Sequence, residues 1–138
     1  KGEELISQES LIEQINIEKY GKRITSKSVE NELIEIAYHE AGHAVLSSIL
    51  MPNLKIEQVT ITPREKSLGF VSFHTENSDS NLSKSEIESL ICIAYAGRVA
   101  QIKEYGDEGL DVGASSDLNI ATRRAYALVS IFGMDKDF

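Results

Sequence analysis

Cysteine is almost missing from this sequence, which has one, Cys92, among its 138 residues. A single cysteine excludes a disulfide within the chain and is typical of a reducing compartment. Because Cys92 lies inside an apolar helical pattern, we expect it to be a buried structural thiol rather than a reactive one.

Long apolar stretches are also absent. The uncharged apolar stretches, Ala44–Met51 among them, are all far shorter than the roughly 20 residues that span a bilayer. The sequence does not open with a basic segment followed by an apolar one, so it shows no signal peptide. It also contains no glycine-rich phosphate loop of the Walker type.

Positive charge is scarce, since 14 Lys and Arg stand against 22 Asp and Glu, for a net charge of −8. This balance argues against nucleic acid or an acidic membrane surface as a main partner, because both repel a negative protein. The length fits one compact domain, and the 41% hydrophobic content is enough for a core. The first residue is Lys1 rather than Met, so we expect the sequence to be a fragment.

The spacing of apolar residues predicts a mainly α fold. Helices are expected over residues 4–19, from about 26–28 to Pro52, from the capping-box pair Ser83 and Glu86 to about Gly106, and from about 115 to a C-cap at Gly133. The second helix has Ile34, Ala37, Ala41, Ala44, Val45 and Ser48 on one side, and the third should turn Ile87, Leu90, Ile91, Ala94 and Tyr95 inward.

A small hairpin should interrupt the helices. Residues 54–62 and 68–73 are rich in Val, Ile, Thr and Phe, and the turn-like segment 63–67 lies between them. The fold predicted is therefore a helical domain with a β-hairpin beside the second helix.

The second helix carries the main chemical signal, His39-Glu40-Ala41-Gly42-His43. Residues four apart lie on one helical face, so His39 and His43 can direct imidazole nitrogens at one metal ion. Zinc in catalytic sites takes three protein ligands and a water. Glu40 would lie beside that water and act as the general base. Gly42 costs the helix about 1 kcal/mol relative to alanine, which indicates close packing there.

The motif leaves the third ligand open. His74, the remaining histidine, has only its residue type in its favour. Asp117 follows two serines in the first turn of the last helix, where the helix dipole favours a carboxylate. From position alone, Asp117 is equally well explained as a ligand or as a helix cap.

Four segments, taken in order, resemble the peptidase domain of the FtsH family of ATP-dependent zinc metalloproteases. They are residues 37–44, residues 59–64 with Leu68-Gly69, residues 96–100, and residues 113–118 with Ala121-Thr122. The resemblance implies zinc held by His39, His43 and Asp117, with Glu40 as the catalytic base. The family commonly has a glutamate where this chain has Gln101, and a neutral amide there is not expected to bind zinc.

The same resemblance implies an organisation and a function. Residues 1–31 would end an upstream ATPase module, and residues 32–138 would form a zinc metallopeptidase domain that is truncated at its C-terminus. The implied enzyme degrades unfolded or damaged proteins as a homo-hexamer on the cytoplasmic face of the inner membrane. ATP and Mg²⁺ would bind only the module outside this chain, and the membrane anchor would also lie outside it. The alternatives are an inactive ring-assembly module of the same fold and a stand-alone zinc peptidase.

Overall fold

The computed structural model of the chain describes residues 5–24, 30–74, 81–109 and 111–136. Most of the described residues are helical, and the two strands among them form one sheet. This confirms the mainly α fold with a small hairpin. The elements in chain order are α1 Gln8–Tyr20, α2 Glu30–Leu50, β1 Lys55–Thr60, β2 Phe70–His74, α3 Lys84–Tyr105, the 3₁₀ helix η2 Gly106–Gly109, α4 Ser115–Tyr126 and the π-helical turn η3 Ala127–Ile131.

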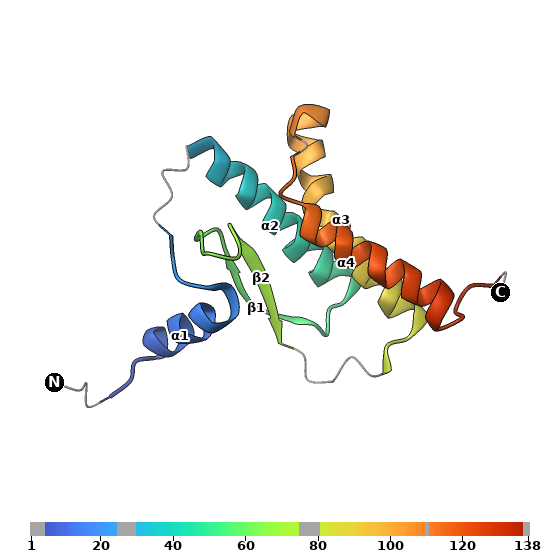
Figure 1. The fold of residues 1–138 in the computed structure, drawn as a ribbon, viewed down its shortest axis with the longest axis horizontal. Coiled ribbons are helices and arrows are strands. Elements are labelled where there is room, and N and C mark those ends of the chain that lie inside the picture. The colour runs from blue at the N-terminus through green and yellow to red at the C-terminus, as the bar shows by residue number, and fades with distance from the viewer. Residues whose placement is uncertain (1–4, 25–29, 75–80, 110, 137–138) are drawn as a thin grey trace.

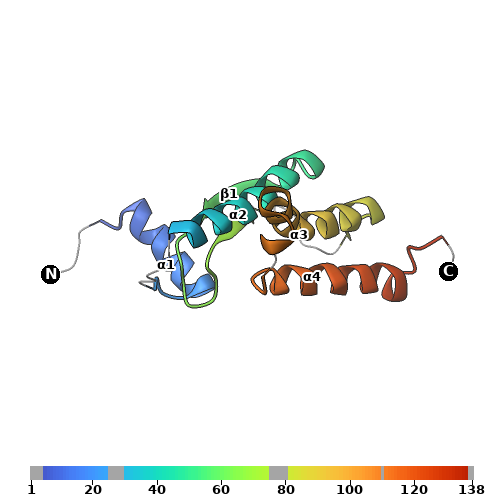
Figure 2. The same ribbon diagram turned by 90° about the horizontal axis from the view of Figure 1, so that it is seen from above.

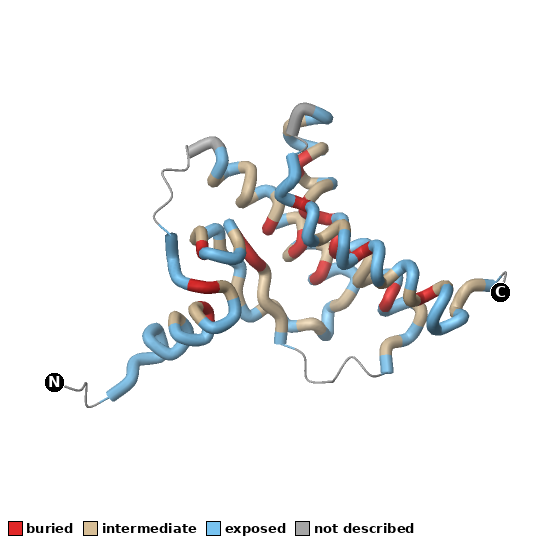
Figure 3. The backbone as a smooth tube through the Cα atoms, in the orientation of Figure 1, coloured by how far each residue is buried: buried red, intermediate tan, exposed pale blue. Residues whose placement is uncertain are grey.

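Helices α2, α3 and α4 pack together on one side of the hairpin. In Figure 1, α2, α3 and α4 cross one another, while α1 lies at the opposite end of the molecule. Figure 2 gives the same order from above, with α1 and the C-terminal end of α4 far apart. Buried residues gather where α2, α3 and α4 meet (Figure 3). The core therefore lies at the crossing of these helices.

Local signals set most of the helix boundaries. At the start of α3, the Glu86 N–H donates to Ser83 Oγ at 3.3 Å and the Ser83 N–H donates to Glu86 Oε2 at 2.8 Å. The helix gives way at Gly106, whose φ of +68° favours glycine. Both predicted boundaries are confirmed, as is the end of α2 just before Pro52. The predicted start of α2 near 26–28 lies outside the described residues.

The hairpin is antiparallel, as the sequence predicts. Val59 faces Val71 in the register, and an irregularity lies between Ile56 and Gln58. This pairing places β2 next to α2, where it can line a site on that helix.

Helices α2 and α3 approach each other unusually closely. A Cβ added at Gly42 would lie 2.5 Å from the Ala96 carbonyl oxygen, so no side chain fits there. This confirms the close packing expected at Gly42. The contact also sets which face of α2 is covered.

The predicted apolar side of α2 is wrong. Ile34 and Val45 are exposed, whereas Glu40, His43 and Ser47 are buried. The reason is that α2 meets α3 through the face around Gly42, where small residues allow the backbones to touch. That face carries the polar motif, and apolar side chains such as Ile34 and Val45 lie outside it.

The prediction of a buried thiol is also wrong, because Cys92 is exposed. It shares an exposed stripe of α3 with Glu88, Tyr95 and Val99, which lie three or four residues apart. Tyr95, expected to point inward, is therefore exposed as well. None of the described helices has the length and apolar character needed to cross a bilayer.

The first helix is attached to the hairpin by a buried arginine. Arg64, whose side chain is 2% exposed, donates to Glu13 through Nη2 at 2.8 Å and to the Gly21 carbonyl through Nη1 at 3.1 Å. Arg23 also pairs with Glu13 at 2.7 Å. Hydrogen bonds from Arg64 and Arg23 lower the pKa of Glu13 from 4.5 to about 2. The carboxylate is thus favoured when α1 is docked.

We predict that this attachment weakens in acid. A carboxyl group whose pKa is lowered on folding contributes stability above its unfolded pKa, and that contribution is lost as the pH falls from about 4.5 to about 2. Glu13→Gln should lower the melting temperature at pH 7 and flatten its dependence on pH in this window. Thermal melts would test this, with Glu9→Gln on the same helix as the control. An unchanged pH profile in Glu13→Gln would contradict the role of the pair.

Candidate metal centre

Three side chains from α2 and α4 converge on one point. His39 and His43 lie one helical turn apart on α2, and their Nε2 atoms are 3.0 Å from each other. Asp117, in the first turn of α4, places Oδ2 3.0 Å from Nε2 of His39 and 3.3 Å from Nε2 of His43. Among the described residues, these three form the one group of potential ligands that could hold a metal ion.

Helix α3 holds both imidazole rings from behind. His43 Nδ1 lies 2.7 Å from the Ile93 carbonyl oxygen, and His39 Nδ1 lies 2.9 Å from Gln101 Oε1. Both oxygens can only accept, so each Nδ1 is the donor and carries the proton. In neutral rings the Nε2 atoms then have the lone pairs that a metal ion would take, whereas a protonated ring donates its Nε2–H to Asp117.

Gly97 makes the approach of the His39 ring possible. A Cβ at this position would lie 2.6 Å from ring atoms of His39. Ile93, Gly97 and Gln101 follow one another at intervals of four residues and therefore share one face of α3. Three successive turns of a single helix thus support the two histidines.

The electrostatics of the group favour a cation at its centre. Burial opposes ionisation of Asp117, but hydrogen bonds from His39 and His43 hold the pKa of its carboxyl well below the usual value. Burial would lower the pKa of His39, yet hydrogen bonds with Asp117 and Gln101 leave that pKa raised. Two neutral imidazoles with facing lone pairs would repel each other, so positive charge between them is stabilising.

The donor set fits zinc. Two imidazole nitrogens and one carboxylate oxygen are ligands that zinc prefers. Separations of 3.0, 3.0 and 3.3 Å are close to those among ligands about 2.0–2.1 Å from a common centre. Each histidine also donates its other N–H to an oxygen, as metal-binding histidines almost always do.

Glu40 is buried beside this group without belonging to it. Its exposed fraction is 7%, and a Cβ added at the neighbouring Gly69 would lie 2.9 Å from its side chain. Burial raises the pKa of Glu40, although His39 and His43 act in the opposite direction. A carboxyl group in such a place is a stronger base than a surface glutamate.

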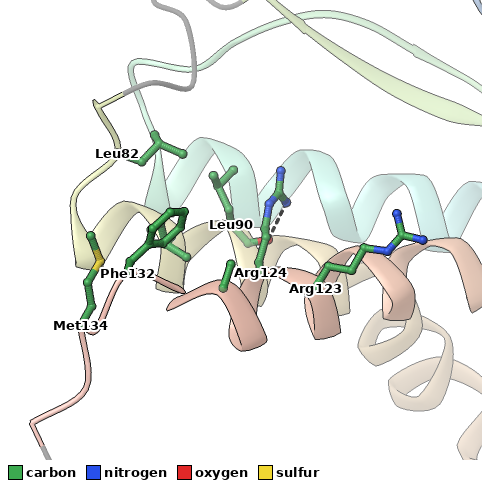
Figure 4. A pocket seen from close by; sticks show the side chains of 8 residues that line it. Leu82, Leu90, Arg123, Arg124, Phe132 and Met134 are labelled. Carbon is green, nitrogen blue, oxygen red and sulfur yellow. Dashed lines mark hydrogen bonds between the residues drawn. The ribbon is translucent and has the colours of Figure 1, made fainter. Parts of the chain in front are cut away.

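The group opens into a cleft of about 760 Å³. Its walls include His39, Glu40 and Asp117, together with β2 residues Phe70 and Val71. A different, more apolar pocket of about 520 Å³ lies between α3 and the end of α4, lined by Leu82, Leu90, Arg123, Arg124, Phe132 and Met134 among others (Figure 4). The residues that line that pocket include no histidine or acidic side chain, so the chemistry is confined to the larger cleft.

The structure thus brings together His39, His43 and Asp117, which the sequence singles out. His74 lies apart, at the end of β2, where its Nδ1 is 3.3 Å from Glu57 Oε1. The support given by Gln101 could not be read from the sequence, which only indicated that this amide is not a ligand. The sequence does place Gln101 eight residues after Ile93, on the same face of the predicted helix, but nothing in it shows that this face meets the histidines.

Comparison with known proteins agrees with this geometry. Residues 25–138 match Peptidase family M41. The chain belongs to that family. It is 34% identical over 115 residues to an ATP-dependent zinc metalloprotease FtsH of Haemophilus influenzae, an alignment that covers 83% of this chain and 18% of the relative. It is also 40% identical over 98 residues to the FtsH of Rickettsia bellii, covering 71% and 15%. The resemblance to FtsH is therefore confirmed.

The M41 chain corresponds to a small part of these relatives. A third relative, the FtsH of Mycoplasmopsis pulmonis, is 37% identical over 105 residues, which cover 76% of this chain and 14% of the relative. The chain thus spans less than a fifth of the length of each relative. The division at residue 31 between an ATPase module and a peptidase domain stays a prediction.

If Asp117 is a zinc ligand, Asp117→Asn should weaken zinc binding. The substitution keeps the size of the side chain but removes the charge, so we expect the affinity to fall by at least about 10–100-fold. His74→Ala is the matched control and should change the affinity little. Competition with a chromogenic chelator would measure both. Tight binding by Asp117→Asn together with loss in His74→Ala would reverse the assignment.

Gln101 offers a second prediction about the site. Gln101→Leu leaves the Nδ1–H of His39 buried without an acceptor, so zinc affinity should drop by about 10–100-fold. Gln101→Glu keeps an acceptor oxygen and should restore binding. Chelator competition and thermal melts with and without zinc would separate this effect from a loss of fold, with Gln14→Leu on α1 as the control. Equal affinities in all three variants would show that the hydrogen bond is dispensable.

Proposed function

We propose that this chain is the zinc metalloendopeptidase domain of an ATP-dependent, membrane-anchored protease that hydrolyses peptide bonds of unfolded or damaged proteins. The observation that carries the proposal is the convergence of His39, His43 and Asp117 in one cleft, with the buried carboxyl of Glu40 beside them. Membership of family M41 supports the same reading.

Each residue has a distinct role in this proposal. His39, His43 and Asp117 hold the metal, and Gln101 and the Ile93 carbonyl orient the two rings. Glu40 takes a proton from the attacking water and passes it to the leaving amine. The chemistry that zinc supplies in such a site is polarisation of the substrate carbonyl and a water pKa lowered to about 7. Burial of Glu40 raises its pKa, which suits it to accept a proton near neutral pH.

The substrate would bind as an extended strand. Leu68, Gly69, Phe70 and Val71 line the cleft, and β2 pairs on one side with β1. Within the described residues the sheet has just these strands, so the other edge of β2 has free backbone groups for a peptide. Recognition through the backbone would accept many sequences, as degradation of unfolded chains requires.

The remaining features of the proposal concern the whole protein. The names of the relatives supply the link to ATP, and the unfolding of substrates would fall to an ATPase module outside this chain. We propose a homo-hexameric ring on the cytoplasmic face of the inner membrane, anchored by segments outside this chain. Unfolded polypeptides would be its partners, and nucleic acid would not.

Glu40→Gln tests the assignment of the base. In the full-length protein, proteolysis of an unfolded substrate should fall by about 10²–10⁴-fold, because the amide cannot accept the proton. Zinc content should stay near one per chain, since Glu40 is not a ligand. Glu88→Gln, on the exposed face of α3, is the control.

Loss of zinc together with activity would show that Glu40 has been misplaced. The 138-residue chain on its own should cleave a tightly folded protein poorly, because it carries no unfolding module. Robust cleavage by the chain alone would contradict that part of the proposal.

A further inference from the structure

The segment before the family match lies against the site. Family M41 matches residues 25–138, yet the described residues 8–24 are joined to the hairpin by specific contacts. Asn16, which is 5% exposed, donates from Nδ2 to Gln58 Oε1 at 3.1 Å. In Figures 1 and 2, α1 and the chain that follows it lie beside the turn of the hairpin. This segment therefore packs against the hairpin, whose second strand lines the cleft.

Backbone hydrogen bonds fix the end of this segment. The Lys66 N–H donates to the Tyr20 carbonyl at 3.1 Å, and the Glu65 N–H donates to the Lys22 carbonyl at 3.1 Å. The Ile24 N–H donates to the Pro63 carbonyl at 3.0 Å. Residues 20–24 therefore run alongside residues 63–66 and cannot shift without breaking this ladder. The buried Arg64 also joins the two segments, because it pairs with Glu13 on α1.

Two residues of this segment, Tyr20 and Ile24, line the cleft. The ring of Tyr20 stacks on Phe70 with centroids 3.7 Å apart and an angle of 13° between the planes. Tyr20 and Ile24 both line the cleft that contains His39, Glu40 and Asp117. Ile24 is 41% exposed, so its side chain is available to a ligand. Ile36 and Val71 extend the same apolar lining.

We propose that Tyr20 and Ile24 form a specificity-determining wall of the active cleft, which favours substrates with a large apolar side chain next to the scissile bond. The inference rests on the proposed peptidase function and adds a preference to it. An extended peptide on β2 reaches the site with side chains projecting to either side of its backbone. A side chain directed at this wall meets an aromatic ring and a branched aliphatic group, which favour apolar contact over water.

Peptide cleavage by the full-length protein tests this. Fluorogenic peptides that differ only in the residue on either side of the scissile bond would be compared by kcat/KM. The parent should prefer Phe or Leu to Ala by about 10-fold or more at one of the two positions, since small differences in apolar contact have effects of this size. Tyr20→Ala should remove most of this preference, because kcat/KM should fall much more for the peptides with Phe or Leu than for the peptide with Ala.

Three further variants keep the test decisive. Tyr20→Phe retains the ring and should retain the preference. Ile24→Lys changes an exposed side chain without disturbing the stack on Phe70, so it decides the matter if Tyr20→Ala does not fold. It should lower cleavage of apolar peptides and raise cleavage of peptides with Asp or Glu. Tyr126→Ala, at an exposed tyrosine that is not among the residues lining the cleft, is the control.

The outcomes separate this inference from the function beneath it. Suppose that Tyr20→Ala and Ile24→Lys keep the preferences of the parent while Glu40→Gln is inactive. The proposed role of Tyr20 and Ile24 would then be wrong, and the proposed peptidase function would still stand. An equal loss for every peptide would also overturn it, since a wall acts selectively. If Glu40→Gln cleaves as well as the parent, the proposed function fails and the inference fails with it.

Discussion

The close contact between α2 and α3 is the constraint on which the site depends. Gly42 removes the side chain that would strike the Ala96 carbonyl, and Gly97 removes the one that would strike the His39 ring. Without both glycines the helices would stand further apart, and Gln101 and the Ile93 carbonyl could not reach the imidazoles at 2.9 and 2.7 Å. The short distance between α2 and α3 therefore fixes the orientation of the His39 and His43 rings.

This arrangement places polar groups where a core would normally be apolar. Glu40, His43, Ser47 and Gln101 are all buried at the meeting of the helices. Burying such groups is unfavourable unless they are hydrogen bonded, and here most find partners: Ser47 Oγ donates to the His43 carbonyl, and His43 and Gln101 take part in the contacts above. The fold therefore has its polar network where chemistry needs it, whereas Ile34, Val45 and Ile49 of α2 are exposed.

Local sequence signals predicted the elements well, because caps, prolines and β-branched runs act over a few residues. Ser83, Glu86, Gly106 and Pro52 each fixed a boundary within their own segment. The buried face of α2 was not predictable in this way, since it depends on the distance to α3. His39 and His43 could be paired from their spacing alone, but Asp117 lies on α4, and only the fold shows that its carboxylate reaches both rings. Tyr20 was out of reach of sequence reasoning for the same reason.

Strand β2 links the base to the wall of the cleft. Gly69, just before the strand, packs against the Glu40 side chain, and Phe70, its first residue, stacks on Tyr20. A shift of α1 would pull on Phe70 through the stacked rings and on the turn through Arg64 and its partner Glu13. Because Gly69 and Phe70 are adjacent, such a shift would also alter the packing around the carboxyl of Glu40. The environment of the base and the width of the cleft are therefore governed by the same short strand, and by whatever holds α1 in place.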